Sequence, residues 1–189
     1  MKKLNWFLFC ALAIIMQACS DASDNAEGPV TAPTAAKITV PIDRDDAQFA
    51  ERAAVSNLTE IELGQLAIKK GVDKRVKNFG MMVMKDQARA DAKLQLIAKN
   101  KKITLPSAID AAEKKTIDSL SNLTGPAFDR AYLSAMFKDH ETDIKLFQVS
   151  SKQLMDPDLR AYAAKYLLTD ERHLDAVDGI KGWMKQAPL

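Results

Sequence analysis

Two late stretches of the chain, residues 128–154 and 157–185, repeat their apolar residues with the period of an α-helix. The first places Phe128, Ala131, Tyr132, Ala135, Met136, Leu146 and Phe147 on one face. The second does the same with Leu159, Tyr162, Ala163, Tyr166, Leu167, Leu174, Val177, Ile180 and Met184. Long amphipathic helices bury such faces by packing against other helices. We therefore predict an all-α fold.

Ionisable residues interrupt both apolar faces. Asp139, His140 and Asp143 lie on the face of the first stretch, and Asp170 and His173 lie on that of the second. A buried charge is costly unless it is paired, hydrogen-bonded or bound to a metal. We therefore expect these side chains to meet in a polar centre inside the protein.

Two earlier helices carry one polar residue each in the same way. The first is predicted to be capped by Asp45 or Asp46 and to end at Lys70, with Glu60 in its apolar arc. The second is predicted from Asp73 to Asn100, with Gln87 in its apolar stripe. Gly80 in this helix is expected to allow a close approach between helices.

A short helix is predicted for residues 107–123, between the two pairs of long helices. Pro126, and the pair Asp156-Pro157, are typical of the first residues of a helix. Four long helices with a crossover that holds a minor helix predict a ferritin-like four-helix bundle over residues 43–187.

The N-terminus has the pattern of a bacterial lipoprotein signal. Lys2 and Lys3 precede an apolar stretch that is too short to span a membrane, and Met16-Gln17-Ala18-Cys19 follows. This pattern resembles a lipobox, which predicts a signal peptide over residues 1–18 and a lipid on Cys19. The alternative is an ordinary signal peptide with an incidental cysteine.

The composition of the mature chain agrees with export. Cleavage would remove Cys10 and leave Cys19 alone, so no disulfide could form within the chain. Residues 19–42 are rich in small and polar residues and are predicted to be a disordered tether. Loss of Lys2 and Lys3 removes the net charge of +2, so nothing in the charge balance favours a nucleic-acid partner. The predicted partner is a membrane, through the lipid.

Several short motifs carry a resemblance to a known family. They are Glu60-Ile-Glu-Leu-Gly64 with Leu66-Ala67, Val76-Lys-Asn-Phe79 with Met82-Val83 and Asp86, Leu105-Pro106, Phe128-Asp129-Arg130-Ala131-Tyr132-Leu133 with His140, and Leu167 with His173-Leu174. Together they resemble a bacterial family of unknown function with a ferritin-like fold, often labelled as outer-membrane or exported proteins. The resemblance implies a periplasm-facing or outer-membrane lipoprotein of a Gram-negative bacterium.

This chain departs from the family pattern at one position of the expected polar centre. The family usually has Asp-His where this chain has Asp86-Gln87. A glutamine keeps a polar group there but is a poor ligand for a transition metal. Any metal site that the family pattern forms would therefore lack one imidazole here.

The sequence leaves two interpretations of the polar centre open. A di-iron site in a four-helix bundle takes Glu from two helices and Glu-x-x-His from the other two, and this chain supplies about half of that set. A single divalent metal held by His140, His173 and one or two carboxylates is the remaining metal interpretation. The candidate ligands are Glu60, Asp139, His140, Asp143, Asp170 and His173. The other interpretation, which the sequence favours, is a buried polar network of the same residues with Gln87.

The functional hypotheses follow from this choice. The first is a non-enzymatic, lipid-anchored envelope protein that binds a partner or serves envelope stress tolerance. The second is a metal-dependent oxidoreductase or a metal-storage protein. The third is a site for a small ligand near the aromatic residues Tyr132, Phe137, Tyr162 and Tyr166, which we expect instead to be core. The sequence favours the first hypothesis.

Overall fold

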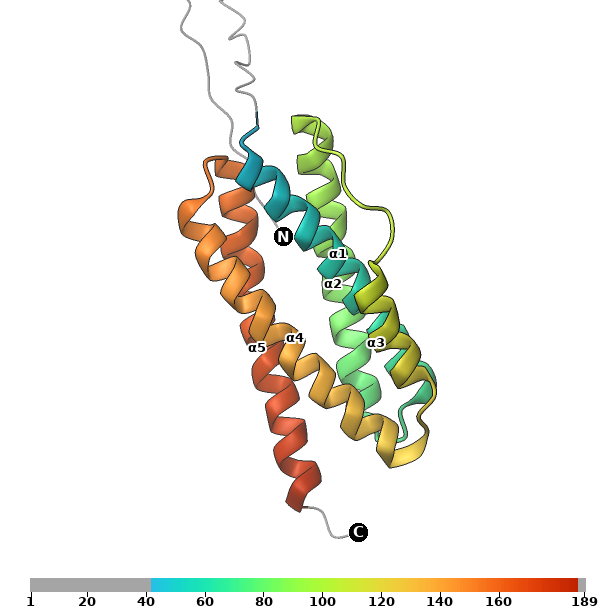
Figure 1. Ribbon diagram of the computed structural model, residues 1–189. Helices are drawn as coiled ribbons and strands as arrows, with labels where there is room; N and C mark the ends of the chain where they lie inside the picture. The colour runs from blue at the N-terminus through green and yellow to red at the C-terminus, as the bar shows by residue number, and fades with distance from the viewer. Residues whose placement is uncertain (1–41, 187–189) are drawn as a thin grey trace, which may run out of the picture. The chain divides into compact units, whose positions relative to one another are not determined.

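The computed structural model describes residues 42–186, which form five α-helices and, within that range, no strand (Figure 1). The helices are α1 (Arg44–Lys70), α2 (Lys74–Lys101), α3 (Ala111–Ser121), α4 (Gly125–Gln153) and α5 (Pro157–Gln186). The predicted all-α bundle with a short helix in the crossover is confirmed. Its ferritin-like character stays a prediction. None of the described helices is long and apolar enough to cross a membrane.

The four long helices form two hairpins. Helix α1 packs along α2, and α4 packs along α5, while α3 lies in the connection between the hairpins and contacts α1 and α4 (Figure 1). The predicted signal peptide, Cys19 and almost all of the predicted tether lie outside the described residues.

Two predicted helix starts were wrong, and aspartate hydrogen bonds explain both. Asp43, in extended conformation, caps α1 by accepting from the backbone N–H of Asp45. Asp46 cannot be the cap because its carboxylate reaches the turn between α4 and α5 instead. Helix α3 begins at Ala111 and not at residue 107, because Asp110 accepts from two N–H groups of its first turn.

The two hairpins repeat the same turn 83 positions apart, which is also the spacing of Gln87 and Asp170. Gly71 ends α1 with φ −56° and ψ 142°, and Leu154 ends α4 with φ −58° and ψ 140°. Asp73 then caps α2, and Asp156 caps α5. The molecule is therefore built from two helical hairpins of the same local design.

Helices α1 and α2 approach each other closely at two glycines. A Cβ on Gly64 would lie 2.6 Å from the carbonyl oxygen of Gly80, and a Cβ on Gly80 would lie 2.6 Å from the Cβ of Ala67. The expectation for Gly80 is confirmed. This contact sets the spacing of the two helices that carry Glu60 and Gln87.

The apolar core is divided along the helix axes. One cluster takes residues 49–54 of α1, 90–97 of α2, 147 of α4 and 159–166 of α5. The other takes residues 63–67, 76–83, 128–136 and 177 of the same four helices. Buried polar side chains lie in the layer between these clusters: Asn57, Thr59, Glu60, Gln87, His140, Asp143, Asp170 and His173. The bundle thus holds a polar layer between two apolar clusters.

Candidate metal centre

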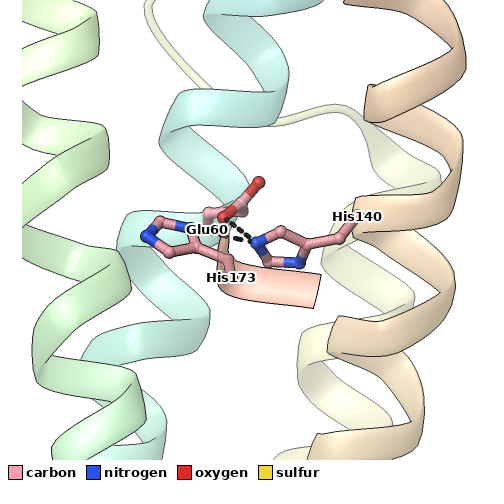
Figure 2. A group of neighbouring side chains, drawn as sticks. All are labelled: Glu60, His140 and His173. Atoms are coloured by element: carbon pink, nitrogen blue, oxygen red, sulfur yellow. Dashed lines mark hydrogen bonds and ion pairs between the residues drawn. The ribbon is translucent and has the colours of Figure 1, made fainter. Parts of the chain in front are cut away.

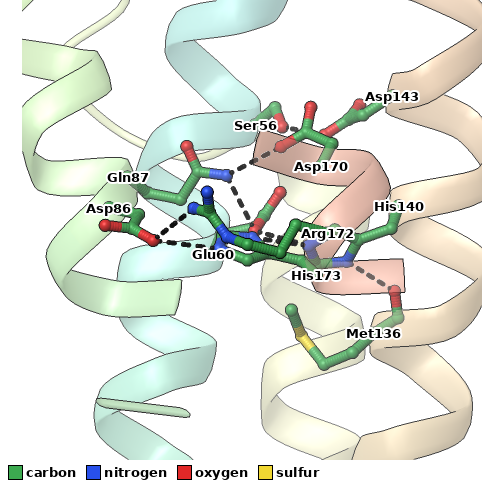
Figure 3. Close-up of polar contacts among 10 residues, drawn as sticks. All are labelled: Ser56, Glu60, Asp86, Gln87, Met136, His140, Asp143, Asp170, Arg172 and His173. Carbon is green, nitrogen blue, oxygen red and sulfur yellow. Dashed lines mark hydrogen bonds and ion pairs between the residues drawn. The ribbon is translucent and has the colours of Figure 1, made fainter. Parts of the chain in front are cut away.

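The structure brings the predicted polar residues together in that middle layer. Glu60, His140 and His173 have no exposed surface, and Asp170 and Asp143 are buried with 2% and 7% exposure. Asp139 is partly exposed as a residue, but its Oδ2 is buried. Gln87 joins them from α2, with 3% exposure. Four long helices therefore contribute to one enclosed group (Figure 3).

A backbone carbonyl fixes the proton on the His140 ring. His140 Nδ1 lies 2.8 Å from the carbonyl oxygen of Met136, one helical turn earlier. A carbonyl oxygen can only accept, so Nδ1 carries the hydrogen and donates it. The other nitrogen, Nε2, is then the one without a hydrogen in the neutral ring.

A carboxylate fixes the proton on the His173 ring in the same way. His173 Nε2 lies 3.2 Å from Oδ2 of Asp86, and the same oxygen accepts a hydrogen bond from Arg172 (Figure 3). The other carboxylate oxygen of Asp86, Oδ1, accepts from Arg89 at the surface. Nε2 therefore donates to Asp86, and Nδ1 is the nitrogen without a hydrogen. Asp86 stands out in the sequence as part of the motif Asp86-Gln87, but its contact with His173 was not anticipated.

The two hydrogen-free nitrogens point at each other and at Glu60 (Figure 2). His140 Nε2 is 3.2 Å from His173 Nδ1 and 3.3 Å from Oε2 of Glu60. The ligand atoms of the three residues all lie within 4.8 Å of one another. Metal–nitrogen bonds of about 2.0–2.1 Å in a tetrahedral site put neighbouring ligand atoms roughly 3.3 Å apart. The two distances from His140 Nε2, to His173 and to Glu60, are close to this value.

Both imidazoles are neutral near pH 7. Burial, with repulsion from His173, lowers the pKa of His140 to about 4, against a partial rise from the Met136 bond. Burial also lowers the pKa of His173, although Asp86 opposes the shift. A single proton from Glu60 would satisfy one of the two facing nitrogens and leave the other unpaired. A cation would satisfy both nitrogens and the carboxylate together.

A group of carboxyls adjoins the histidines. Burial is the main cause that raises the pKa of Glu60, followed by repulsion from Asp170, Asp139 and Asp143. Burial, with repulsion from Asp143, raises the pKa of Asp170 to about 8. In the described part of the chain, no lysine or arginine forms an ion pair with any of these four carboxyls. Their charge is therefore left for protons or cations to balance.

Amide and hydroxyl groups orient these carboxyls. Gln87 Nε2 donates to Oε2 of Glu60 at 3.0 Å and to Oδ1 of Asp170 at 3.3 Å. The Ser56 hydroxyl donates to Oδ2 of Asp143, and burial raises the pKa of Asp143 to about 6 while this bond holds it down. Ser56 gave no signal in the sequence because it lies beside the apolar arc of α1.

The aromatic residues of the third hypothesis are core residues. Tyr162 and Tyr166 belong to the first apolar cluster, Tyr132 belongs to the second, and Phe137 packs against that second cluster. Tyr162 also accepts a hydrogen bond from Asn57 at 3.0 Å. These contacts place the four aromatic rings in the apolar core.

The match to a family model decides where this fold belongs. The model for a domain of unknown function, DUF4142, matches residues 31–180. The chain belongs to the DUF4142 family. This agrees with the resemblance to a family of unknown function, while the outer-membrane label stays a prediction. No curated protein matches this DUF4142 chain.

Two solved structures share the helical fold of this DUF4142 chain. A crystal structure of a DUF305 fragment from Deinococcus radiodurans aligns with a TM-score of 0.68 at 12% identity, over 76% of this chain and 99% of that one. CopM in the Cu(I)-bound form aligns with a TM-score of 0.62 at 14% identity, over 75% of this chain and 96% of that one. At these identities the similarity shows the fold alone.

Proposed function

We propose that this DUF4142 protein binds a divalent transition-metal ion at His140, His173 and Glu60, as a metal-holding protein of the cell envelope. The observation that carries the proposal is the convergence of His140 Nε2, His173 Nδ1 and Glu60 Oε2, with both ring N–H groups directed outward. Metal-ligating histidines usually donate their second nitrogen to a carboxylate or a carbonyl in this way. We therefore propose metal binding in place of the metal-free polar network that the sequence favours.

The donor set favours some metals over others. Two imidazoles and a carboxylate suit Zn(II), Fe(II) or Cu(II), whereas Cu(I) prefers thiolate and thioether ligands. CopM, which shares the fold, is described in a Cu(I)-bound form, and it makes copper a reasonable ion to test. For this chain we propose that a divalent ion binds more tightly than Cu(I). We propose no catalytic step.

Metal titration of the purified full-length chain tests the proposal. After treatment with chelator, we expect Zn(II) to bind with a stoichiometry of at least one and to raise the melting temperature. The His140→Ala/His173→Ala variant should lose at least about 100-fold in Zn(II) affinity, since it removes two of three ligands. Asp175→Asn, at an exposed position of the same helix as His173, is the control. Equal Zn(II) affinity in the double variant and the unmodified chain would refute the proposal, provided that circular dichroism shows both folded.

We also propose that a lipid on Cys19 holds the bundle at the envelope membrane, because Met16-Gln17-Ala18-Cys19 follows an apolar leader. Cys19→Ala should shift the protein from the membrane to the soluble fraction in cell fractionation. Cys10→Ala is the matched control, since Cys10 precedes the cleavage site and should not matter. Full membrane retention of Cys19→Ala would contradict the anchor.

A further inference from the structure

We propose that the polar centre holds a second cation position, formed by Glu60, Asp139 and Asp143, which takes a hard divalent ion such as Mn(II). Glu60 would serve both positions, one oxygen on each, so the inference rests on the proposed function of the histidine site. The second position differs in chemistry from the first, because its protein ligands are all carboxylate oxygens.

Two buried oxygen atoms point to an ion at this place. Glu60 Oε2 faces the histidines, while Glu60 Oε1 receives no hydrogen bond from an amide N–H or a hydroxyl group of the described residues, and the neighbouring carboxyl of Asp143 lies within hydrogen-bond reach of Glu60. Oδ2 of Asp139 is buried and without a donor in the same way. Glu60 has no exposed surface. Buried oxygens that lack a donor cost free energy, and a cation between them would remove that cost.

The spacing of the three carboxyls allows one ion to reach all of them. One oxygen from each of Glu60, Asp139 and Asp143 lies within 4.8 Å of the other two. The Ser56 hydroxyl bonds to Asp143 and orients it, as groups around a metal site commonly orient the ligands. Carboxylate oxygens are the ligands that Mn(II), Mg(II) and Ca(II) prefer over transition metals of softer character.

Charge balance favours two ions over one. Glu60, Asp139, Asp143 and Asp170 are four carboxyl groups in one largely buried layer, without an ion pair to lysine or arginine in the described residues. Once metal binding has displaced the protons of these carboxyls, one divalent ion on the neutral imidazoles would balance two of the four negative charges. A second divalent ion balances all four. Buried charge that is left uncompensated is costly, so the second position completes the balance.

The architecture explains why the acids meet. Glu60 and Asp143 occupy equivalent positions of the two hairpins, 83 residues apart, and so do Gln87 and Asp170. Each hairpin therefore directs an acid or an amide from the same level of its helices toward the layer where the hairpins meet. The competing explanation is that shared protons, and not an ion, hold these carboxyls together.

A two-metal titration separates the two explanations. The chelator-treated full-length chain is first saturated with Zn(II) and then titrated with Mn(II), whose free fraction is measured by electron paramagnetic resonance. We expect one Zn(II) and one Mn(II) per chain. Asp139→Asn/Asp143→Asn should lose at least about 10-fold in Mn(II) affinity, because only one of the three carboxylate ligands of the second position remains. The same variant should keep its Zn(II) affinity within about threefold. Asp175→Asn should behave as the unmodified chain.

The outcomes distinguish the two proposals. If Mn(II) binds the unmodified chain and the double asparagine variant equally, or binds neither, the second position is refuted and shared protons remain. If Zn(II) binding does not depend on the histidines while Mn(II) binding depends on the aspartates, the proposed function fails and the acidic position stands. If circular dichroism shows that the double variant is unfolded, Asp139→Asn alone is used in its place, because the single variant keeps the contact between Ser56 and Asp143.

Discussion

Asp46 and Asp129, 83 positions apart, each hold the turn of the other hairpin. The Asp46 carboxylate accepts from the backbone N–H groups of Met155 at 2.9 Å and Asp156 at 2.8 Å. The Asp129 carboxylate accepts from those of Val72 at 3.1 Å and Asp73 at 2.8 Å. Both carboxylates are buried. The two hairpins are thus tied by a reciprocal pair of charge-assisted contacts, one near each end of the bundle.

Removing either aspartate should destabilise the fold by a similar amount. Asp129→Ala leaves two turn N–H groups without their acceptor, and we expect a loss of about 1–3 kcal/mol in the free energy of unfolding. Asp46→Ala should lose about the same, because its contacts are equivalent. Urea denaturation followed by circular dichroism measures both. Asp45→Ala, at an exposed neighbouring position, is the control, and an Asp129→Ala variant as stable as this control would contradict the expectation.

Gly80→Ala should destabilise the contact between α1 and α2. The new methyl group would lie 2.6 Å from Ala67 Cβ and 2.9 Å from the Gly64 carbonyl oxygen, and overpacking of this kind costs about 1–3 kcal/mol. Gly179→Ala is the matched control, and we expect it to change the free energy of unfolding in the opposite direction. A Cβ there meets nothing within 4 Å, so we expect a gain of about 0.5–1 kcal/mol from helix propensity. In thermal denaturation, the melting temperature should therefore fall for Gly80→Ala and rise for Gly179→Ala.

The metal-free protein should lose stability between pH 6.5 and pH 8. Burial raises the pKa of Asp170 to about 8, whereas an unfolded aspartate titrates near 4. In this interval the folded chain binds more protons than the unfolded chain, so the free energy of unfolding falls as the pH rises. The histidines act oppositely, but their effect fades as the pH rises above their unfolded pKa of about 6.5.

Denaturation in the presence of chelator at several pH values checks this slope. We expect a decrease on the order of 1–2 kcal/mol from Asp170 across the interval. Asp170→Asn should flatten the slope, and Asp175→Asn should leave it unchanged. A stability that rises from pH 6.5 to pH 8 in the unmodified chain would mean that the buried carboxyls are ionised in the folded state.

Asp86→Ala should weaken zinc binding without removing a ligand. Asp86 accepts the Nε2–H of His173 at 3.2 Å and thereby directs Nδ1 toward His140 and Glu60. Loss of such a supporting residue typically costs 10–100-fold in metal affinity. Arg89→Ala removes only a surface partner of Asp86 and should have a much smaller effect. Calorimetric titration with Zn(II) compares the two, and similar losses would argue against this role of Asp86.

The helical period was sufficient to find the main residues of the site. Glu60, His140 and His173 stand out because each interrupts an apolar face, and burial of amphipathic helices then brings the interruptions together. The phase of a helix does not reveal ring orientation. The orientation of His140 depends on the backbone carbonyl of Met136, and because every residue has such a carbonyl, the sequence gives no sign of it. The orientation of His173 depends on Asp86, which lies at the margin of the apolar stripe of α2.

The internal repeat is hard to see in the sequence because most equivalent positions carry different side chains, although Asp46 matches Asp129 and Asp73 matches Asp156. Asn57 corresponds to His140, and Ala90 corresponds to His173, each 83 positions apart. What the hairpins share is backbone geometry, such as the nearly equal dihedral angles of Gly71 and Leu154. One of these residues is a glycine and the other a leucine, since an extended φ/ψ pair admits both.

Gln87→His tests whether the polar centre is a metal site that lacks one ligand. Gln87 Nε2 lies 3.0 Å from Glu60 Oε2, the oxygen that His140 also faces. An imidazole at this position would bring a third nitrogen to the same point, and we expect Zn(II) affinity to rise at least about 10-fold. If the centre were only a hydrogen-bonded network, the added ring would lose the amide bonds to Glu60 and Asp170 and lower stability with no gain from metal. Melting temperatures with and without Zn(II) separate these results, because only a metal site turns the substitution into a zinc-dependent stabilisation. Gln95→His, at an exposed position of the same helix, should show no such dependence.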